Sequence, residues 1–478
     1  MVLKIRKDVK DAIIDLIEKN KFTKNFGAKR IISELRSLSY VDTEIPSRSQ
    51  ISNKLSYYRK NKFKFNNEIS PLEEKLRRFI FTGDEHDCQP FVYFYTKDES
   101  QRLILGDGSD DHPFVSGLTS KKMLSVINTA IQYQNMCKIV LHIDCTFKCN
   151  DNEFPVLVIG ITDVQQQFHP LSINVISHRD SDTYYRAFEE FKLLLRLIYP
   201  DVEFSPDFIM TDCVDSERKA ALLSFPMTTH LMCFFHVQKN VKEHLRKQSK
   251  AIQEQYKKDV QDLHESIDQK EYDSKYQEIF NKWSVSLPEF ANYFDSQWNN
   301  GNFVSWKIFN SSPGVATTNN ALESFNKTIK KSYTLAIRHT LPALFDIIID
   351  RLIRDVSMDL LYGRKCFEIK RKPTATVISK LDSLGDLYSV TTEDDLLYRF
   401  MKNSTQEVHI VEFENCSCSC RYYKKFAYCK HVLFIFKKKN VDCAKIITDR
   451  RFKYRGNTRM VRRQRGRVAD ARPALLRN

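Results

Sequence analysis

The chain has 478 residues, enough for about two to four domains, and 42% of them are hydrophobic, which allows ordinary buried cores. Its 75 lysines and arginines against 60 aspartates and glutamates give a formal net charge of +15, which favours nucleic acid over an acidic membrane surface as a partner. No apolar run reaches membrane-spanning length and the first residues do not resemble a secretory signal, so we expect no membrane partner. The twelve cysteines then indicate reduced thiols and metal ligation rather than a disulfide framework.

Residues 1–66 are predicted to form a small, basic, helix-turn-helix-like domain. Apolar residues recur at helical spacing over 9–17 and 31–38, and a third helix follows a capping box at 47–50. A polar, basic last helix suits docking into a DNA groove, although a generic three-helix packing unit with a solvated face has the same pattern. The candidate DNA-binding residues of this helix are Arg48, Lys54 and Arg59.

Residues 70–136 are predicted to form a mixed segment that precedes the main domain. Apolar runs at 91–95 and 102–105 predict strands, and residues 119–133 predict a helix. No residue pattern in this segment indicates a chemical function.

The pattern of residues 137–360 predicts an α/β or α+β domain. Three consecutive apolar strands are followed by a helix, and strands and helices then alternate. Residues from about 237 to 310 are charged and helical in pattern, and we expect a helical insertion there rather than more sheet. The predicted strands lie near 139–143, 154–161, 168–176, 208–211 and 229–234, and the helices between them near 181–198 and 216–223.

Asp144 and Asp212 close the first and fourth of these strands. Sites gather at the carboxyl ends of strands, and the two carboxylates would lie close together if their strands are neighbours. Such a pair repels unless divalent cations neutralise it, and carboxylate oxygens select Mg²⁺ or Mn²⁺. Glu323 offers a third carboxylate, and two metal ions held by three carboxylates can activate a water or a 3′-hydroxyl at a phosphodiester. Most acidic residues are nevertheless solvated, and Asp207 and Asp215 flank Asp212, so the composition alone is a weak signal.

Residues 418–431 contain three cysteines and a histidine in the order C-x-C, eight residues, C-x-H. Thiolates and a neutral imidazole are the ligands of a tetrahedral structural zinc site. The pattern resembles the SWIM zinc finger, including an aromatic residue soon after the second cysteine and an apolar run after the histidine. Cys416 and Cys418 form an alternative C-x-C pair. A cluster without metal would instead consist of buried thiols beside a surface histidine. The predicted zinc ligands are Cys418, Cys420, Cys429 and His431.

The predicted C-terminal region, residues 361–445, contains this finger at 405–440. Residues 446–478 are strongly basic and have too few apolar residues to fold alone, so we expect a disordered tail. Such a tail can be a nuclear-localisation signal or a DNA-contacting arm, and it can also be merely solvated.

Three segments carry a more specific pattern: residues 143–150, the strand 154–160, and residues 318–326. Together they resemble the transposase domain of Mutator-like elements (MULEs), and the similarity covers roughly residues 75–360. The resemblance implies an α/β fold with a ribonuclease-H-like catalytic core, a helical insertion, and a SWIM finger after the core. It also implies an Asp-Asp-Glu catalytic triad, which here is Asp144, Asp212 and Glu323.

The same family carries a C-x-x-H motif after the second aspartate, and Cys233 and His236 match it. The resemblance implies that this pair supports the active site, whereas the residues alone fit half of a zinc site or a buried thiol beside a helix-capping histidine. Asn319 is a further accessory candidate, because it lies one helical turn before the candidate glutamate. Lys327 and Lys330 would meet phosphates if DNA crossed the site, although a solvated lysine face has the same pattern.

The leading hypothesis is a nuclear DDE-type transposase that binds terminal inverted repeats and target DNA as double strands. It would cut and transfer DNA strands with Mg²⁺ or Mn²⁺ and use Zn²⁺ as a structural ion, and a homo-oligomer on DNA is possible. The alternative is a transposase-derived DNA-binding or regulatory protein that does not cut DNA. A zinc-dependent interaction module alone would leave the three carboxylates unexplained.

Overall fold

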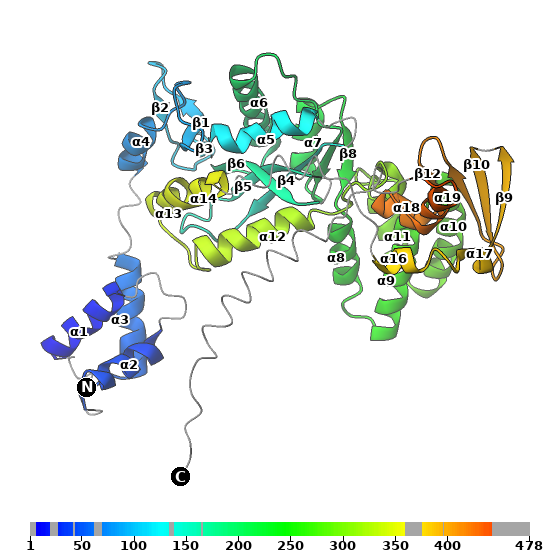
Figure 1. Ribbon diagram of the computed structural model, residues 1–478. Coiled ribbons are helices and arrows are strands. Elements are labelled where there is room, and N and C mark those ends of the chain that lie inside the picture. Colours follow the sequence, from blue (N-terminus) through cyan, green and yellow to red (C-terminus); the bar gives the residue numbers. More distant parts are fainter. Residues whose placement is uncertain are drawn as a thin grey trace, which may run out of the picture.

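The protein is described here by a computed structural model (Figure 1). It describes residues 6–19, 27–41, 44–61, 69–132, 138–163, 166–358, 375–394 and 396–441. Within these ranges no helix combines the length and hydrophobicity needed to cross a membrane. The predicted tail at 446–478 and the side chain of Arg59 lie outside the described part of the chain.

The N-terminal residues form three packed helices, α1 (Lys7–Lys19), α2 (Ala28–Ser37) and α3 (Arg48–Asn61). Their shared core is small and aliphatic, and Ile13, Ile31 and Ile51 are fully buried in it. The predicted capping box is confirmed. The Ser47 N–H donates to Gln50 Oε1 at 2.9 Å, and the Gln50 N–H donates to Ser47 Oγ at 3.3 Å.

The main domain is built on one mixed sheet of eight strands in the order β2-β1-β3-β6-β5-β4-β7-β8. β5 is antiparallel to both β4 and β6, and β7 and β8 run parallel to β4. The segment predicted to precede this domain supplies β1 to β3, because β3 pairs with β6 and extends the same sheet. The strands are β1 (Phe91–Lys97), β2 (Leu103–Ile104), β3 (Val115–Thr119), β4 (Val140–Thr146), β5 (Val156–Thr162), β6 (Phe168–Ile176), β7 (Phe208–Thr211) and β8 (Thr229–Met232).

Helices cover both faces of this sheet (Figure 1). α5, α6 and α7 pack on one face, and α4, α12 and α13 pack on the other. Leu141, Ile143 and Cys145 of β4 belong to the first face. Because strand residues alternate, His142 and Asp144 point towards the second face, where α12 meets β4. The helices are α4 (Ile69–Arg77), α5 (Lys121–Gln132), α6 (Ser181–Ile198), α7 (Asp215–Ser224), α12 (Asn320–Thr328), α13 (Leu341–Ile347) and α14 (Arg354–Met358).

The predicted insertion is helical and has an aromatic core of its own. The three tryptophans of the chain, Trp283, Trp298 and Trp306, all lie in it and are at most 1% exposed. The insertion therefore folds as a compact unit between β8 and α12 (Figure 1). Its helices are α8 (Phe234–His244), α9 (Lys250–His264), α10 (Gln269–Ser286) and α11 (Pro288–Phe294).

The C-terminal module is a four-stranded antiparallel sheet, ordered β12-β11-β10-β9, with helices α18 and α19. It touches the insertion, because Arg421 pairs with Glu271 at 2.8 Å. It also touches the loop before α12, where the Gly314 N–H donates to the Lys424 carbonyl at 2.9 Å. Its elements are α16 (Ala375–Ser379), α17 (Leu384–Leu387), β9 (Tyr388–Asp394), β10 (Leu397–Lys402), β11 (Val408–Glu412), β12 (Ser417–Cys418), α18 (Arg421–Phe426) and α19 (Lys430–Lys438).

Candidate active site and metal centre

Asp144 and Asp212 lie side by side because β4 and β7 are neighbouring parallel strands. The register pairs His142 with Met210, and the same offset joins Asp144 to Asp212. β4 continues to Thr146, so Asp144 lies within the strand and not at its predicted end. The two carboxyl groups are close enough to share a hydrogen bond.

The Asp144 carboxyl group holds a proton more tightly than an ordinary aspartate does. Burial and the neighbouring carboxylate of Asp212 raise the pKa of Asp144 to about 8. The Asn326 amide donates to Asp144 Oδ2 at 2.8 Å, while its own Oδ1 is buried with no hydrogen-bond partner. A divalent cation would replace the proton and satisfy these oxygens, so the pair has the chemistry of a cation site.

Glu323 faces this pair from α12. Its Oε1 is buried and has no hydrogen-bond partner among the protein atoms. Burial raises the pKa of Glu323. The charge of His236 opposes this rise and the charge of Asp212 adds to it, so His236 and Asp212 both lie within electrostatic range of Glu323. In the described part of the chain, the ligand atoms of Asp144, Asp212 and Glu323 do not form one cluster within 4.8 Å. Glu323 is thus a third buried carboxylate near the aspartate pair, with an oxygen that no protein donor satisfies.

Asn319 and His142 form a hydrogen-bonded layer behind Asp212. The Asn319 amide donates to Asp212 Oδ1 at 2.9 Å and to the Ile143 carbonyl at 3.3 Å. Its Oδ1 therefore faces His142 Nδ1, 2.8 Å away, and that nitrogen must carry the hydrogen. His142 Nε2 is then the acceptor for the Thr162 hydroxyl at 2.9 Å. Burial lowers the pKa of His142 to about 4, so the ring is neutral and its tautomer is fixed.

Cys233 and His236 pack against the same carboxylate from the start of α8. His236 Nδ1 lies 2.9 Å from Asp212 Oδ1, which is an ion-pair distance without the alignment of a hydrogen bond. Burial opposes protonation of His236, but its contacts with Asp212 and Cys233 outweigh burial and raise the pKa of His236 to about 10. The fully buried Cys233 thiol accepts the Asn319 N–H at 3.1 Å. The C-x-x-H pair therefore contacts Asp212 through His236 and Asn319 through Cys233.

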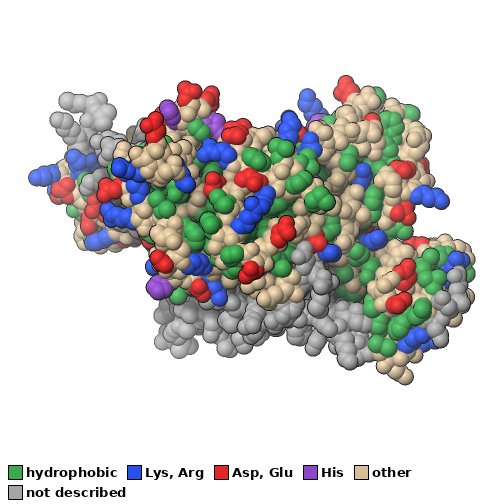
Figure 2. Space-filling view, turned by 90° about the horizontal axis from the view of Figure 1, so that it is seen from above, with side chains coloured by type: hydrophobic (Ala, Val, Ile, Leu, Met, Phe, Trp, Pro, Cys, Tyr) green, Lys and Arg blue, Asp and Glu red, His purple; other side chains and the backbone are tan. Residues whose placement is uncertain are grey.

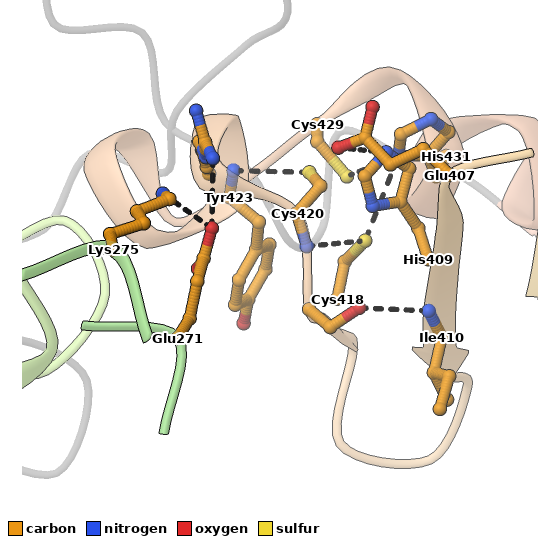
Figure 3. A network of polar contacts seen from close by, with 12 residues as sticks. Glu271, Lys275, Glu407, His409, Ile410, Cys418, Cys420, Tyr423, Cys429 and His431 are labelled. Atoms are coloured by element: carbon orange, nitrogen blue, oxygen red, sulfur yellow. Dashed lines mark hydrogen bonds and ion pairs between the residues drawn. The ribbon is translucent and has the colours of Figure 1, made fainter. Parts of the chain in front are cut away.

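The four predicted zinc ligands, Cys418, Cys420, Cys429 and His431, form one buried cluster (Figure 3). Their ligand atoms all lie within 4.8 Å of one another, and His431 Nδ1 is 3.7 Å from the Cys418 sulfur and 3.9 Å from the Cys429 sulfur. Cys420 and Cys429 cap α18 and α19, where each sulfur accepts a backbone N–H of the first turn. Cys416 lies outside this cluster. Three thiols and one imidazole at this spacing are the ligand set of a structural zinc ion.

Comparison with protein families matches three parts of the chain. Residues 140–240 match the MULE transposase domain, residues 207–360 match the Mutator family of transposases, and residues 407–440 match the SWIM zinc finger. These matches confirm the resemblance to Mutator-like transposases that carry a SWIM zinc finger. No curated protein matches it.

A further buried carboxylate near this pair, Glu217, was not among the predicted site residues. It is 2% exposed, and its Oε1 accepts the Asp212 N–H at 3.4 Å. Burial and the charges of Asp212 and Asp144 raise the pKa of Glu217 well above its usual value. The sequence spacing could have predicted its burial, because Glu217 lies one turn before Ala220 and Ala221 and shares their buried face of α7.

The predicted DNA-contacting residues lie in two separate places. On α3, Arg48 is exposed, whereas Lys54 is partly buried and its surroundings include charged residues of α1. Near α12, Lys327 is exposed and lies within electrostatic range of Glu323, while Lys330 is partly buried. Arg48 and Lys327 are therefore the more accessible members of the two groups.

Proposed function

We propose that this protein is a nuclear DDE-type transposase that binds element-end DNA and performs Mg²⁺- or Mn²⁺-dependent strand cleavage and strand transfer. The observation that carries the proposal is the Asp144–Asp212 pair, set by strand register and faced by the partnerless Glu323 Oε1. The strand order β6-β5-β4-β7-β8, antiparallel at first and then parallel, supports a ribonuclease-H-like core.

Asp144, Asp212 and Glu323 would hold the divalent cations, which activate the attacking water or 3′-hydroxyl and stabilise the leaving oxygen. The surrounding residues orient these ligands. Asn319 fixes Oδ1 of Asp212, and Asn326 fixes Oδ2 of Asp144. Protonated His236 places a positive charge beside Asp212, which offsets the repulsion among the three carboxylates.

The flanking domains would supply DNA recognition and stability. The three N-terminal helices would bind DNA in a helix-turn-helix-like manner, with Arg48 on an exposed part of α3. A zinc ion at the cysteine–histidine cluster would stabilise the C-terminal module. We expect contacts with double-stranded terminal repeats and target DNA, and a homo-oligomer would allow two element ends to be held together.

The test combines gel-shift and cleavage assays on DNA from either flank of the gene, with Mg²⁺ and at two salt concentrations. Asp144→Asn should reduce cleavage by at least about a thousandfold while DNA binding persists, because it removes a cation ligand and leaves the basic surface unchanged. Asp201→Asn, on an exposed residue after α6, is the matched control and should cut like the parent. Deleting residues 1–62 should have the reverse effect and weaken end-specific binding.

Cleavage by Asp144→Asn at the parent rate would contradict the catalytic assignment. If the parent and Asp144→Asn bind the same DNA sequence and neither cuts it, the protein is instead a transposase-derived DNA-binding regulator. In both cases binding should weaken as salt rises, because phosphate contacts release counterions.

A further inference from the structure

A groove between α8 and α9 has a different charge pattern from the surface seen in Figure 2. That view shows the side of α5 and α6, where basic and acidic side chains are interspersed. The groove has a volume of about 370 Å³, and its charged lining residues are Lys239, Lys242 and Lys257 against a single acid, Glu254. No ion pair joins any of these three lysines to a carboxylate within the described ranges. The charged lining of the groove therefore carries a net positive charge.

The groove begins beside the carboxylate centre. α8 carries His236 in its first turn, 2.9 Å from Asp212, and Lys239 follows one turn later. Lys239 also lies within electrostatic range of Glu323, where its charge counteracts part of the burial-induced rise in the pKa of that carboxyl. A nucleic-acid strand bound by the three lysines would consequently have one end near the candidate catalytic carboxylates.

Phe235 adds an aromatic surface to the same groove. Its side chain lines the groove and is 38% exposed, although it lies between the buried Phe234 and the half-buried His236. An exposed ring in a lysine-lined groove is how proteins hold single-stranded nucleic acid, because the lysines contact the phosphates and any base can stack on the ring. A duplex does not offer an unstacked base to such a ring.

We propose that the α8–α9 groove binds a single-stranded DNA segment next to the cleavage position, with Lys242 and Lys257 on its phosphates and Phe235 against an unpaired base. This inference rests on the proposed transposase function and deepens it, because it names the form of DNA that this face receives. The groove residues lie outside the sets assigned above to catalysis, zinc binding and duplex recognition.

The test measures fluorescence anisotropy of a labelled oligo(dT) strand with the full-length protein, in buffer without divalent cations or chelator. Lys242→Gln combined with Lys257→Gln should weaken binding about five- to tenfold near 0.1 M salt and reduce the salt slope by about one, as expected for lost single-strand phosphate contacts. The matched control, Lys250→Gln combined with Lys258→Gln, removes the same charge from exposed positions of α9 that do not line the groove. It should change affinity less than twofold.

Phe235→Ala should weaken oligo(dT) binding at least about fivefold without changing the salt slope, because stacking does not release counterions. Duplex DNA of the same length should be insensitive to Phe235→Ala. Equal losses in the groove and control pairs would overturn the site, and equal losses for single strand and duplex with Phe235→Ala would overturn the single-strand assignment. These outcomes are separable from the catalytic proposal, because cleavage by Asp144→Asn at the parent rate contradicts that proposal whatever the groove binds.

Discussion

The cysteine–histidine cluster and the carboxylate centre differ in how the chain brings their ligands together. All four ligands of the cluster come from residues 418–431, where α18 and α19 each begin on a ligand cysteine. The carboxylates are spread from Asp144 to Glu323. Asp144 and Asp212 lie side by side because β4 and β7 pair in register, and Glu323 comes near them because α12 meets β4. A local cluster depends on one short segment, whereas a dispersed centre depends on the whole sheet and on the layer behind it. The loss of a zinc ligand should therefore disrupt only the zinc finger. Substitutions far along the chain from the carboxylates should, in contrast, reduce strand cleavage.

The largest expected effect is the loss of one ligand from the local cluster. Cys420→Ser should abolish stoichiometric zinc binding and unfold the finger, because a structural zinc ion supplies on the order of 10 kcal/mol to a small module. Cys416→Ser is the matched control and should retain zinc, since Cys416 lies outside the cluster. Zinc per chain is measured by atomic absorption after gel filtration. Tryptophan fluorescence, which reports the insertion alone, should show that the insertion remains folded.

Zinc retained by Cys420→Ser and lost by Cys416→Ser would move the ligand assignment to the other C-x-C pair. Collapse of the tryptophan signal in Cys420→Ser would show instead that the finger is not an independent unit. The second result would contradict the expectation that loss of a zinc ligand disrupts only the zinc finger.

The same contrast explains which features could be predicted from the sequence. The third strand and the helix after it occupy the predicted residues, 168–176 and 181–198, because periodicity within one element determines them. The pairing of β3 with β6 was not predicted, since partner choice between strands is not encoded in either strand alone. His142 and Glu217 were missed for a related reason. Each is a polar residue inside an apolar pattern, and its role depends on a partner from another element.

The second prediction concerns the layer behind the carboxylates. His142→Leu removes the donor that orients Asn319, so the Asn319 amide can turn away from Asp212. Strand cleavage should fall about 10–100-fold, as it does when residues that orient metal ligands are lost, and the Mg²⁺ concentration for half-maximal rate should rise. His142→Asn is the conservative variant, because its amide N–H can replace Nδ1–H, and it should recover most of the rate. The measurement is single-turnover cleavage against Mg²⁺ concentration.

DNA affinity should be the same in the parent and in both His142 variants. If His142→Leu and His142→Asn lose equal activity with unchanged Mg²⁺ dependence, the histidine has only a packing role in β4. The dispersed centre would then depend on backbone register alone and not on its hydrogen-bonded second layer.

The smallest expected effect tests whether the zinc finger and the insertion communicate through the contact of Arg421 with Glu271, which is labelled in Figure 3. Arg421 follows the ligand Cys420, and Glu271 lies on α10 of the insertion, where Lys275 also contacts it at 2.5 Å. The two paired side chains are 42% and 27% exposed, so solvent screening limits the pair to about 0.5 kcal/mol. Arg421→Gln should lower the tryptophan-reported melting temperature by about 1–2 °C in the zinc-loaded protein. The effect should vanish after zinc removal, because the finger no longer holds α18 in place.

Lys438→Gln, which changes an exposed residue of α19, is the control and should cause no shift in melting temperature with or without zinc. A shift of equal size with and without zinc would mean that α18 docks on the insertion independently of the metal.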